Sequence, residues 1–201
     1  MLSQLEELDV TLFLFFNGMH NEFFDFLFYW ISNKWIWIPL YAVLAYYLYK
    51  KEKKHFFYLL MLVAVMITLS DQISSSLIKN SVMRLRPTHD PMLTGEVHFV
   101  NNYKGGKYGF VSSHAANAFA IAVFIYRLLK RRKTGWKSFM LIWALIVSYS
   151  RIYLGVHYPA DIIGGAMVGA ILGYATAKTY RHLQIHVIPS RKNTNRSNEK
   201  V

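Results

Sequence analysis

The chain has 201 residues, of which 54% are hydrophobic and only 17% charged, and this is more apolar surface than one small water-soluble core can bury. Its net charge of +12 alone would suit a nucleic-acid partner, but the positive residues cluster beside apolar stretches, as they do at the cytoplasmic ends of membrane helices. Cysteine is absent, which excludes disulfides and cysteine-based zinc sites. The apolar composition and the placement of the charges together predict a single membrane-embedded domain without a nucleic-acid partner.

The N-terminal segment is predicted to lie in the membrane interface. Its first nine residues carry Glu6, Glu7 and Asp9 instead of a basic region, so no cleavable signal peptide is expected. Residues 10–31 are apolar, but polar residues and a glycine interrupt them at Asn17, Gly18, His20, Asn21, Glu22 and Asp25. This pattern favours two short amphipathic pieces in the interface, with a sixth membrane-spanning helix as the alternative.

Five later segments are apolar over about the 17 to 25 residues that a membrane-spanning helix needs. They are residues 33–50, 55–77, 114–130, 137–156 and 159–179. Together they predict an all-α fold, a polytopic membrane helix bundle of about five to six transmembrane helices. Residues 1–188 form its single domain, whereas residues 189–201 lack apolar periodicity and are predicted to be a disordered basic tail.

Three basic clusters orient the predicted bundle. They are Lys50, Lys51, Lys53 and Lys54, then Arg127 and Lys130 to Lys133 with Lys137, and then the tail from Lys178 onward. The positive-inside rule puts these clusters and the C-terminus in the cytoplasm. The loops 78–113 and 150–158 are then expected on the outer face of a multi-pass inner-membrane protein, and the three polar clusters described next all fall on that face.

The first polar cluster follows the second apolar segment and contains Lys79, Arg84 and Arg86. Cations at a helix end commonly snorkel toward water and have no further role. These cations, however, lie on the face where the positive-inside rule predicts few of them. They therefore suggest an anionic ligand, and the planar guanidinium fork of arginine matches phosphate oxygens.

The second polar cluster is Ser112, Ser113 and His114. Ser112 is a suitable N-cap for a helix that begins near Ser113, because the next residues are rich in alanine. The N-terminus of a helix binds phosphate through unpaired N–H groups and the positive end of the helix dipole. An ordinary cap beside an interfacial histidine is the alternative interpretation.

The third polar cluster contains Ser150, Arg151, His157 and Asp161. Pro159 is well placed as the first residue of the last membrane helix, which puts Asp161 in the first turn of that helix. A carboxylate four residues after His157 can accept a hydrogen bond from one ring nitrogen and leave the other free as a nucleophile. Asp161 as a simple helix cap is the alternative, but ionisable residues at membrane depth are functional by default.

These clusters resemble the motifs of the type 2 phosphatidic acid phosphatase superfamily of membrane lipid phosphatases. The first motif, Lys, six residues, then Arg-Pro, is matched by Lys79, Arg86 and Pro87. The second, Pro-Ser-Gly-His, keeps Ser112 and His114 but has Val111 and Ser113 at its other two positions. The third, Ser-Arg, five residues, His, three residues, Asp, is matched by Ser150, Arg151, His157 and Asp161.

The resemblance implies a role for each matched residue. His157 would attack phosphorus and form a phosphohistidine, and Asp161 would orient it. His114 would protonate the leaving oxygen and then activate water. The phosphoryl oxygens would be held by Lys79, Arg86, Ser112, Ser113 and Arg151. Neither a metal nor another cofactor is implied, because the sequence lacks the carboxylate-rich set that Mg²⁺ prefers.

The implied substrate is a lipid phosphate monoester or diphosphate in the bilayer, such as undecaprenyl diphosphate, phosphatidylglycerol phosphate or a phosphate of lipid A. A catalytically silent lipid-binding or transport protein on the same fold is one alternative. Vanadate-dependent haloperoxidases resemble the same motif set, but they are soluble, whereas this chain has five predicted spans. The sequence does not indicate an oligomeric state.

Specificity is expected to lie in the long loop from Thr88 to Val111. Its segment 103–108 would touch a headgroup or form an ordinary solvated turn, and the sequence leaves both open. His89, Asp90 and His98 lack the spacing of a metal site, so they are predicted to be surface residues.

Overall fold

The computed structural model describes residues 2–129 and 134–186, and these ranges contain helices and loops but no β-strand. The α-helices are α1 (Leu2–Gly18), α2 (Glu22–Ser32), α3 (Ile38–Glu52), α4 (Phe56–Asp71), α5 (Lys79–Val82), α6 (Ser113–Leu128), α7 (Thr134–Tyr153) and α8 (Pro159–His186). A π-helical segment, Gln72–Ile78, joins α4 to α5, and short 3-10 turns occur at Lys34–Trp37, Lys53–His55, Pro87–His89 and Pro91–Leu93.

The predicted all-α fold is confirmed. Each of the five predicted spans corresponds to one long helix, namely α3, α4, α6, α7 and α8, and α8 continues to His186, seven residues beyond the predicted end. Two stretches of the described chain, Lys34–Val82 and Pro159–Gln184, are long and apolar enough to cross a membrane. Five to six spans therefore remain a prediction, and the predicted tail of residues 189–201 lies outside the described residues.

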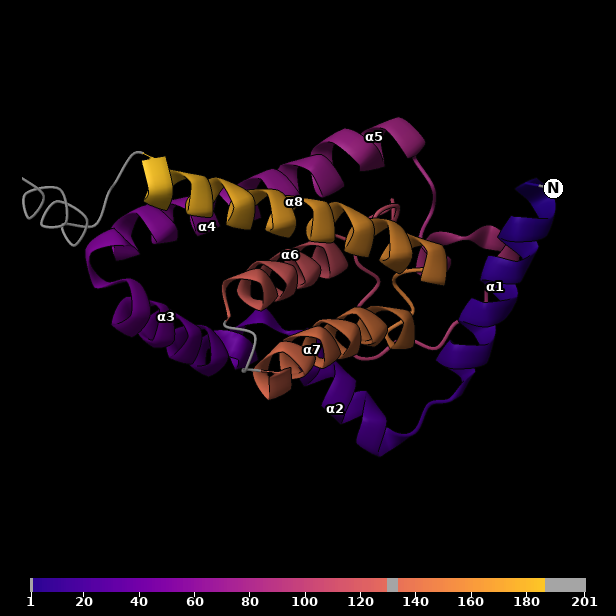
Figure 1. The fold of residues 1–201 in the computed structure, drawn as a ribbon. Helices are drawn as coiled ribbons and strands as arrows, with labels where there is room; N and C mark the ends of the chain where they lie inside the picture. Colours follow the sequence, from indigo (N-terminus) through magenta and orange to yellow (C-terminus); the bar gives the residue numbers. More distant parts are fainter. Residues whose placement is uncertain (1, 130–133, 187–201) are drawn as a thin grey trace, which may run out of the picture.

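The first apolar stretch is divided by a turn at Lys53, which has φ 12° and ends α3. From this turn α3 and α4 run apart (Figure 1). Large apolar side chains remain exposed on the outside of the bundle, as at Phe26, Leu77 and Ile171, which are 67–68% exposed. An exposed apolar surface of this extent is typical of a protein that contacts lipid.

The centre of the fold is the pair α6 and α8, with α7 against the other side of α6 (Figure 1). Alanines of α6 are buried against glycines of α8, and a Cβ placed at Gly169 would overlap the backbone carbonyl of Ala116. Small residues let two membrane helices approach to backbone contact. This close contact fixes the beginning of α6 beside the beginning of α8, where two of the predicted polar clusters lie.

The α6–α8 contact gives a first testable prediction. Gly169→Ala should destabilise the protein by about 1–3 kcal/mol, because the added methyl overpacks a backbone contact. Gly135→Ala, in α7, is the matched control, since a Cβ there has no neighbour within 4 Å. The measurement is the thermal unfolding midpoint of each variant in detergent, and equal midpoints would contradict the packing argument.

The N-terminal segment forms two helices separated at residues 19–21, so its predicted division into two pieces is confirmed, although α1 already begins at Leu2. Asn21 caps α2 by accepting the N–H of Phe24 at 3.0 Å. Helix α1 lies across the ends of α7 and α8 (Figure 1), and Phe13 packs edge-on against Tyr158 at 5.3 Å. An interfacial position for these helices remains a prediction.

Candidate active site

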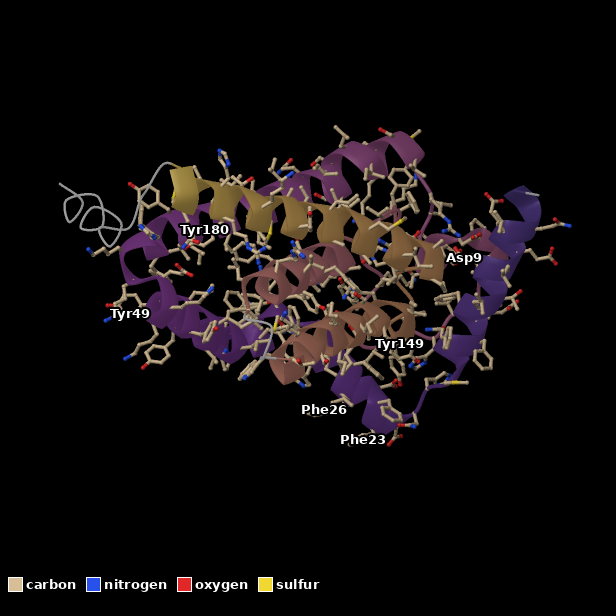
Figure 2. All side chains as sticks on the ribbon, viewed as in Figure 1. Asp9, Phe23, Phe26, Tyr49, Tyr149 and Tyr180 are labelled. Atoms are coloured by element: carbon tan, nitrogen blue, oxygen red, sulfur yellow. The ribbon has the colours of Figure 1, made fainter. Side chains whose placement is uncertain are left out.

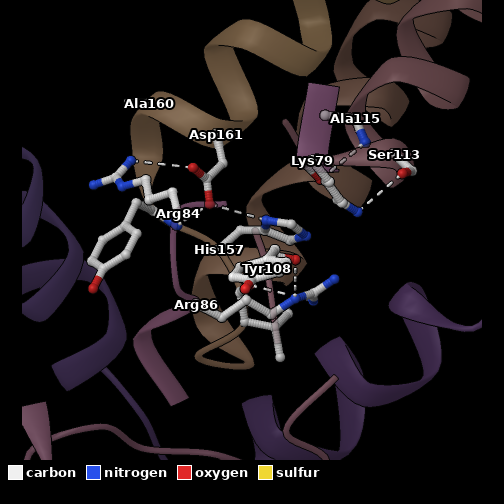
Figure 3. Close-up of polar contacts among 12 residues, drawn as sticks. Lys79, Arg84, Arg86, Tyr108, Ser113, Ala115, His157, Ala160 and Asp161 are labelled. Carbon is white, nitrogen blue, oxygen red and sulfur yellow. Dashed lines mark hydrogen bonds and ion pairs between the residues drawn. The ribbon is translucent and has the colours of Figure 1, made fainter. Parts of the chain in front are cut away.

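Helix ends and connecting loops bring the three polar clusters together (Figure 3). Lys79 comes from the start of α5, Arg86 from the loop after it, Ser113 from the start of α6, and His157 and Asp161 from the junction of α7 and α8. The polypeptide also links the second and third clusters directly, because the Ser112 N–H donates to the Asp161 carbonyl at 3.0 Å. Clusters that lie up to 82 residues apart in the sequence thus share one site.

His157 and Asp161 form the pair that their spacing predicts. Pro159 is the first residue of α8, and the His157 Nδ1 atom lies 3.1 Å from Asp161 Oδ2 (Figure 3). The same oxygen accepts the N–H of Tyr158 at 3.1 Å, which fixes the carboxylate. Because a carboxylate oxygen accepts, Nδ1 carries the proton and the lone pair of Nε2 remains free for attack.

The electrostatic environment keeps the His157 ring neutral. The ring is only 1% exposed, and burial lowers its pKa well below the ordinary histidine value. The cations of Arg86, Arg151 and Lys79 lower that pKa further. A neutral imidazole is the form that a nucleophile requires.

Three cations face this histidine without a carboxylate of their own. Lys79 Nζ donates to the Ser113 hydroxyl at 3.2 Å, and Arg86 Nε donates to the carbonyl of Tyr108 at 3.0 Å (Figure 3). Arg151 is 98% buried, donates to Ser32 and, at 2.9 Å, to the hydroxyl of Tyr103, and has no partner for its Nε.

Within the described part of the chain, none of these three cations forms an ion pair. Buried charge without a partner is costly, so their convergence indicates a place for an anion.

His114 and the two serines lie at the beginning of α6. Ser112 is the N-cap, as predicted, and its hydroxyl accepts the N–H of Ala115 at 3.4 Å. His114 interacts electrostatically with His157 and Arg151, so the structure brings the two imidazoles into one site. Ser113 stands where the family motif has glycine, and its hydroxyl supplies a partner for Lys79.

The structure assigns Arg84 to a different place from the other cations. Its guanidinium forms ion pairs with Asp9 at 2.7 Å and with Asp161 Oδ1 at 3.2 Å, and it stacks on the Tyr158 ring at 4.1 Å. The expectation that it faces an anionic ligand together with Lys79 and Arg86 is therefore wrong. The two carboxylates attract it to the rear of the His157–Asp161 pair.

Asp9 is the participant that the sequence did not reveal. It points from α1 toward the first turn of α8 (Figure 2), and its Oδ1 accepts the N–H of Ala160 at 2.8 Å. An acid at the N-terminus of a helix is a common stabilising device. Its only sequence signal was an acidic residue beside an apolar run, and nothing in the pattern connected that residue to a helix 150 residues later.

His89, Asp90 and His98, which were predicted to be surface residues, are each partly exposed, and the last two also have partners within the fold. His98 Nε2 lies 2.8 Å from Asp25 Oδ1, and Asp90 accepts the hydroxyl of Tyr158 at 2.9 Å. Helices α1 and α2 cover this loop, which the sequence could not show. In the described ranges no group of three or more histidines and acids is arranged to hold a metal ion.

Comparison with known proteins identifies the arrangement. Residues 56–184 match the family model described as the PAP2 superfamily, and this match together with the relatives given below makes the chain a membrane lipid phosphatase. The chain belongs to the PAP2 superfamily. This confirms the resemblance drawn from the three motifs, and it confirms the prediction of a phosphatase.

Several relatives are named lipid phosphatases. A lipid A 4′-phosphatase of Bacteroides thetaiotaomicron is 39% identical over 177 residues, which are 87% of this chain and 77% of the relative. A protein of the same name from Porphyromonas gingivalis is 38% identical, over 87% of this chain and 73% of the relative. An undecaprenyl-diphosphatase, BcrC of Bacillus subtilis, is 38% identical over only 65 residues, 32% of each chain.

Two solved structures share the fold. LpxE of Aquifex aeolicus superposes with a TM-score of 0.62 at 23% identity, over 85% of this chain and 95% of that one. A PAP2-type phosphatidylglycerolphosphate phosphatase from Bacillus subtilis gives a TM-score of 0.67 at 19% identity, over 90% of this chain and 88% of the other. At these identities the likeness concerns the fold alone.

Proposed function

We propose that this protein removes the 4′-phosphate of lipid A at the outer face of the inner membrane, through a phosphohistidine on His157. The observation that carries the reaction is the site itself, in which the neutral imidazole of His157 faces Lys79, Arg86 and Arg151, and none of these three cations has an ion-pair partner among the described residues. The substrate rests on the two relatives named as lipid A 4′-phosphatases, which align with 87% of this chain.

In the first step the Nε2 lone pair of His157 attacks phosphorus in line with the leaving sugar oxygen. The P–N bond forms as the P–O bond breaks, and His114 donates its proton to the leaving oxygen. Asp161 holds the Nδ1 proton and stabilises the positive charge that develops on the ring. The three cations and the Ser113 N–H stabilise the equatorial oxygens, which carry the negative charge of the transition state.

In the second step water releases the phosphate. His114, now without its proton, accepts one from the water, whose oxygen attacks phosphorus as the P–N bond breaks. His157 returns to its neutral form with Nδ1 still bonded to Asp161, and inorganic phosphate leaves. One histidine thus serves first as the acid and then as the base, and the cycle closes without a change in the enzyme.

The outward orientation is supported by the placement of charge. Helix α4 begins beside the lysines of the turn at Lys53–His55 and leads, through the π-helical segment, to Lys79 at the site. A basic turn at one end and the site at the other are what the positive-inside rule predicts for a site on the outer face. The C-terminus belongs with the basic turn in this proposal.

The substrate is tested with a panel of purified lipids offered to the detergent-solubilised protein. We expect phosphate release from lipid A, with the 4′-phosphate lost and the 1-phosphate kept in the product, as read by mass spectrometry. Release only from undecaprenyl diphosphate would favour the activity for which the BcrC relative is named. No release from any lipid phosphate would favour the silent lipid-binding alternative.

Chelation gives a second test of this mechanism. We expect EDTA to leave the rate unchanged within about twofold, because the roles of a metal are assigned to three cations of the protein. The measurement is phosphate release before and after dialysis against the chelator. Loss of activity that Mg²⁺ or Zn²⁺ restores would contradict it.

The pH dependence follows from the lowered pKa of His157. Because this pKa lies well below 6.5 in the folded protein, the nucleophile stays neutral as the pH falls through 6.5, and it is lost only at lower pH. In Arg86→Gln one cation is removed, so the acid limb of kcat/KM should move to higher pH. The substrate phosphate also titrates at about pH 6, but it does so equally for the wild type and for Arg86→Gln. A difference between their two pH profiles therefore reports the change in the pKa of His157.

A further inference from the structure

The buried guanidinium of Arg151 is bonded to two hydroxyls from outside the three motifs. The Ser32 Oγ atom accepts a hydrogen bond from its Nη1, and the Tyr103 hydroxyl accepts one from its Nη2 at 2.9 Å. The cation also lies over the Tyr103 ring, 5.4 Å from the ring centroid. Ser32 precedes the range that matches the family model, so the family match assigns it no role.

These two contacts leave one edge of the guanidinium without a partner. A guanidinium has five N–H donors, and Ser32 and Tyr103 accept one from each terminal nitrogen. The Nε of Arg151 is buried and has no hydrogen-bond partner in the described ranges. Nε shares an edge of the guanidinium with one terminal nitrogen, and such an edge binds two oxygens of a phosphoryl group. A buried donor without a partner is costly, so this edge indicates a place for an anion.

The end of α2 fixes the hydroxyl of Ser32. Ser32 is the last residue of this helix and is 9% exposed. The indole Nε1 of Trp37 donates to the carbonyl of Ile31 at 2.8 Å, which ties the end of α2 to the turn that follows it. The helix therefore presents Ser32 to Arg151 from a fixed position.

A tight turn fixes the hydroxyl of Tyr103. Asn101 and Asn102, which precede it, have φ of 52° and 54°, a conformation that asparagine tolerates better than most residues. The N–H of Tyr103 closes this turn by donating to the carbonyl of Val100 at 3.0 Å. Two separate elements, the end of α2 and this turn, thus meet at one guanidinium.

We propose that Ser32 and Tyr103 are positioning residues, which hold Arg151 with its Nε edge toward the phosphoryl group bound at His157. Both partners are neutral, so they orient the guanidinium without cancelling the charge that attracts the phosphate. A carboxylate in either place would fix the side chain but would neutralise it. The inference rests on the phosphate site of the proposed function, and it is independent of which lipid carries the phosphate.

The first test removes the hydroxyl of Tyr103. Negative charge on the equatorial oxygens grows in the transition state, so a misaligned arginine weakens transition-state binding more than substrate binding. For Tyr103→Phe we expect kcat to fall about tenfold, the effect of one charged hydrogen bond, with KM within about twofold of the wild type. Vanadate adopts the five-coordinate geometry of the transition state, and calorimetry should show it binding about tenfold more weakly.

Tyr126→Phe is the matched control for Tyr103→Phe. Both tyrosines are 38% exposed and both have a cation over the ring, which at Tyr126 is Lys137 at 4.7 Å. The Tyr126 hydroxyl, however, forms no hydrogen bond in the part of the chain that the structure describes. Tyr126→Phe should therefore keep the wild-type kcat and vanadate affinity.

The second test removes the hydroxyl of Ser32. Ser32→Ala should weaken vanadate binding about as much as Tyr103→Phe does, and Ser32→Thr should restore it, because threonine retains the hydroxyl. Ser70→Ala is the matched control, since the Ser70 hydroxyl is buried and has no partner among the described residues. It should bind vanadate as the wild type does.

Thermal midpoints in detergent separate positioning from damage to the fold. A Tyr103→Phe or Ser32→Ala protein with the wild-type midpoint and the wild-type affinity for vanadate would overturn the proposal. So would an equal loss in Ser32→Ala and Ser32→Thr, and so would a wild-type protein that hydrolyses a lipid phosphate but does not bind vanadate. If the wild type hydrolyses no lipid phosphate, the proposed function fails, and weaker vanadate binding in Tyr103→Phe would still support the inference. If Ser32→Ala does not fold, Tyr103→Phe decides alone.

Discussion

His157→Ala is expected to lower kcat by at least about 10⁴-fold, because no other group can take the place of a covalent nucleophile. The ring lies in a buried site, and its Nδ1 is 3.1 Å from the carboxylate that fixes its tautomer, which leaves Nε2 free to attack. The measurement is phosphate release from the lipid substrate. His55→Ala, at the turn between α3 and α4, is the matched control and should keep the wild-type rate.

The intermediate can be observed directly. Substrate labelled in its phosphate should leave an acid-labile label on the wild-type protein when the reaction is stopped in alkali, and His157→Ala should take up none. His114→Ala should retain the nucleophile but lose about 10²–10⁴-fold in rate through the missing acid and base. A His157→Ala protein that still turns over, or that still takes up label, would refute the phosphohistidine mechanism.

The long helices and the three motifs were predictable because each depends on a local pattern. Apolar length predicted α3, α4, α6, α7 and α8, and the N-cap at Ser112 and the helix start at Pro159 follow from rules that act within a few residues. His157 and Asp161 are four residues apart, so their contact also required no knowledge of the fold. Local physics is sufficient for these features.

Features that depend on tertiary contact were missed. Arg84 and Arg86 are two residues apart, and only the positions of α1 and α8, which carry Asp9 and Asp161, make Arg84 a partner of two acids and leave Arg86 bonded to a carbonyl. In the same way, the sequence could not show that Asp25 of α2 contacts His98. The π-helical segment before Lys79 has no recognisable sequence signal, although segments of this kind often occur at functional sites.

Replacing Arg84 should have the largest effect of any change outside the matched motifs. Arg84→Gln removes the cation from two carboxylates whose side chains are 10% and 0% exposed, those of Asp9 and Asp161. Breaking a buried ion pair on one side costs about 3–5 kcal/mol, so we expect a large fall in the thermal midpoint. Turnover should fall as well, because Arg84 acts on His157 through Asp161 as a positioning residue.

The control separates charge from stacking. Lys137→Gln removes a cation that stacks on the Tyr126 ring at 4.7 Å and has no carboxylate partner among the described residues, so it should leave both midpoint and rate nearly unchanged. Arg84→Lys should recover part of the activity by restoring the charge, although a point charge cannot bridge both acids.

A double variant tests whether Asp9 and Arg84 act as one unit. If they do, adding Asp9→Asn to Arg84→Gln should cost less than the sum of the two single changes, since one buried charge is removed together with its partner. Additive losses, or an Arg84→Gln protein with the wild-type rate, would show that the pair behind Asp161 does not position the nucleophile.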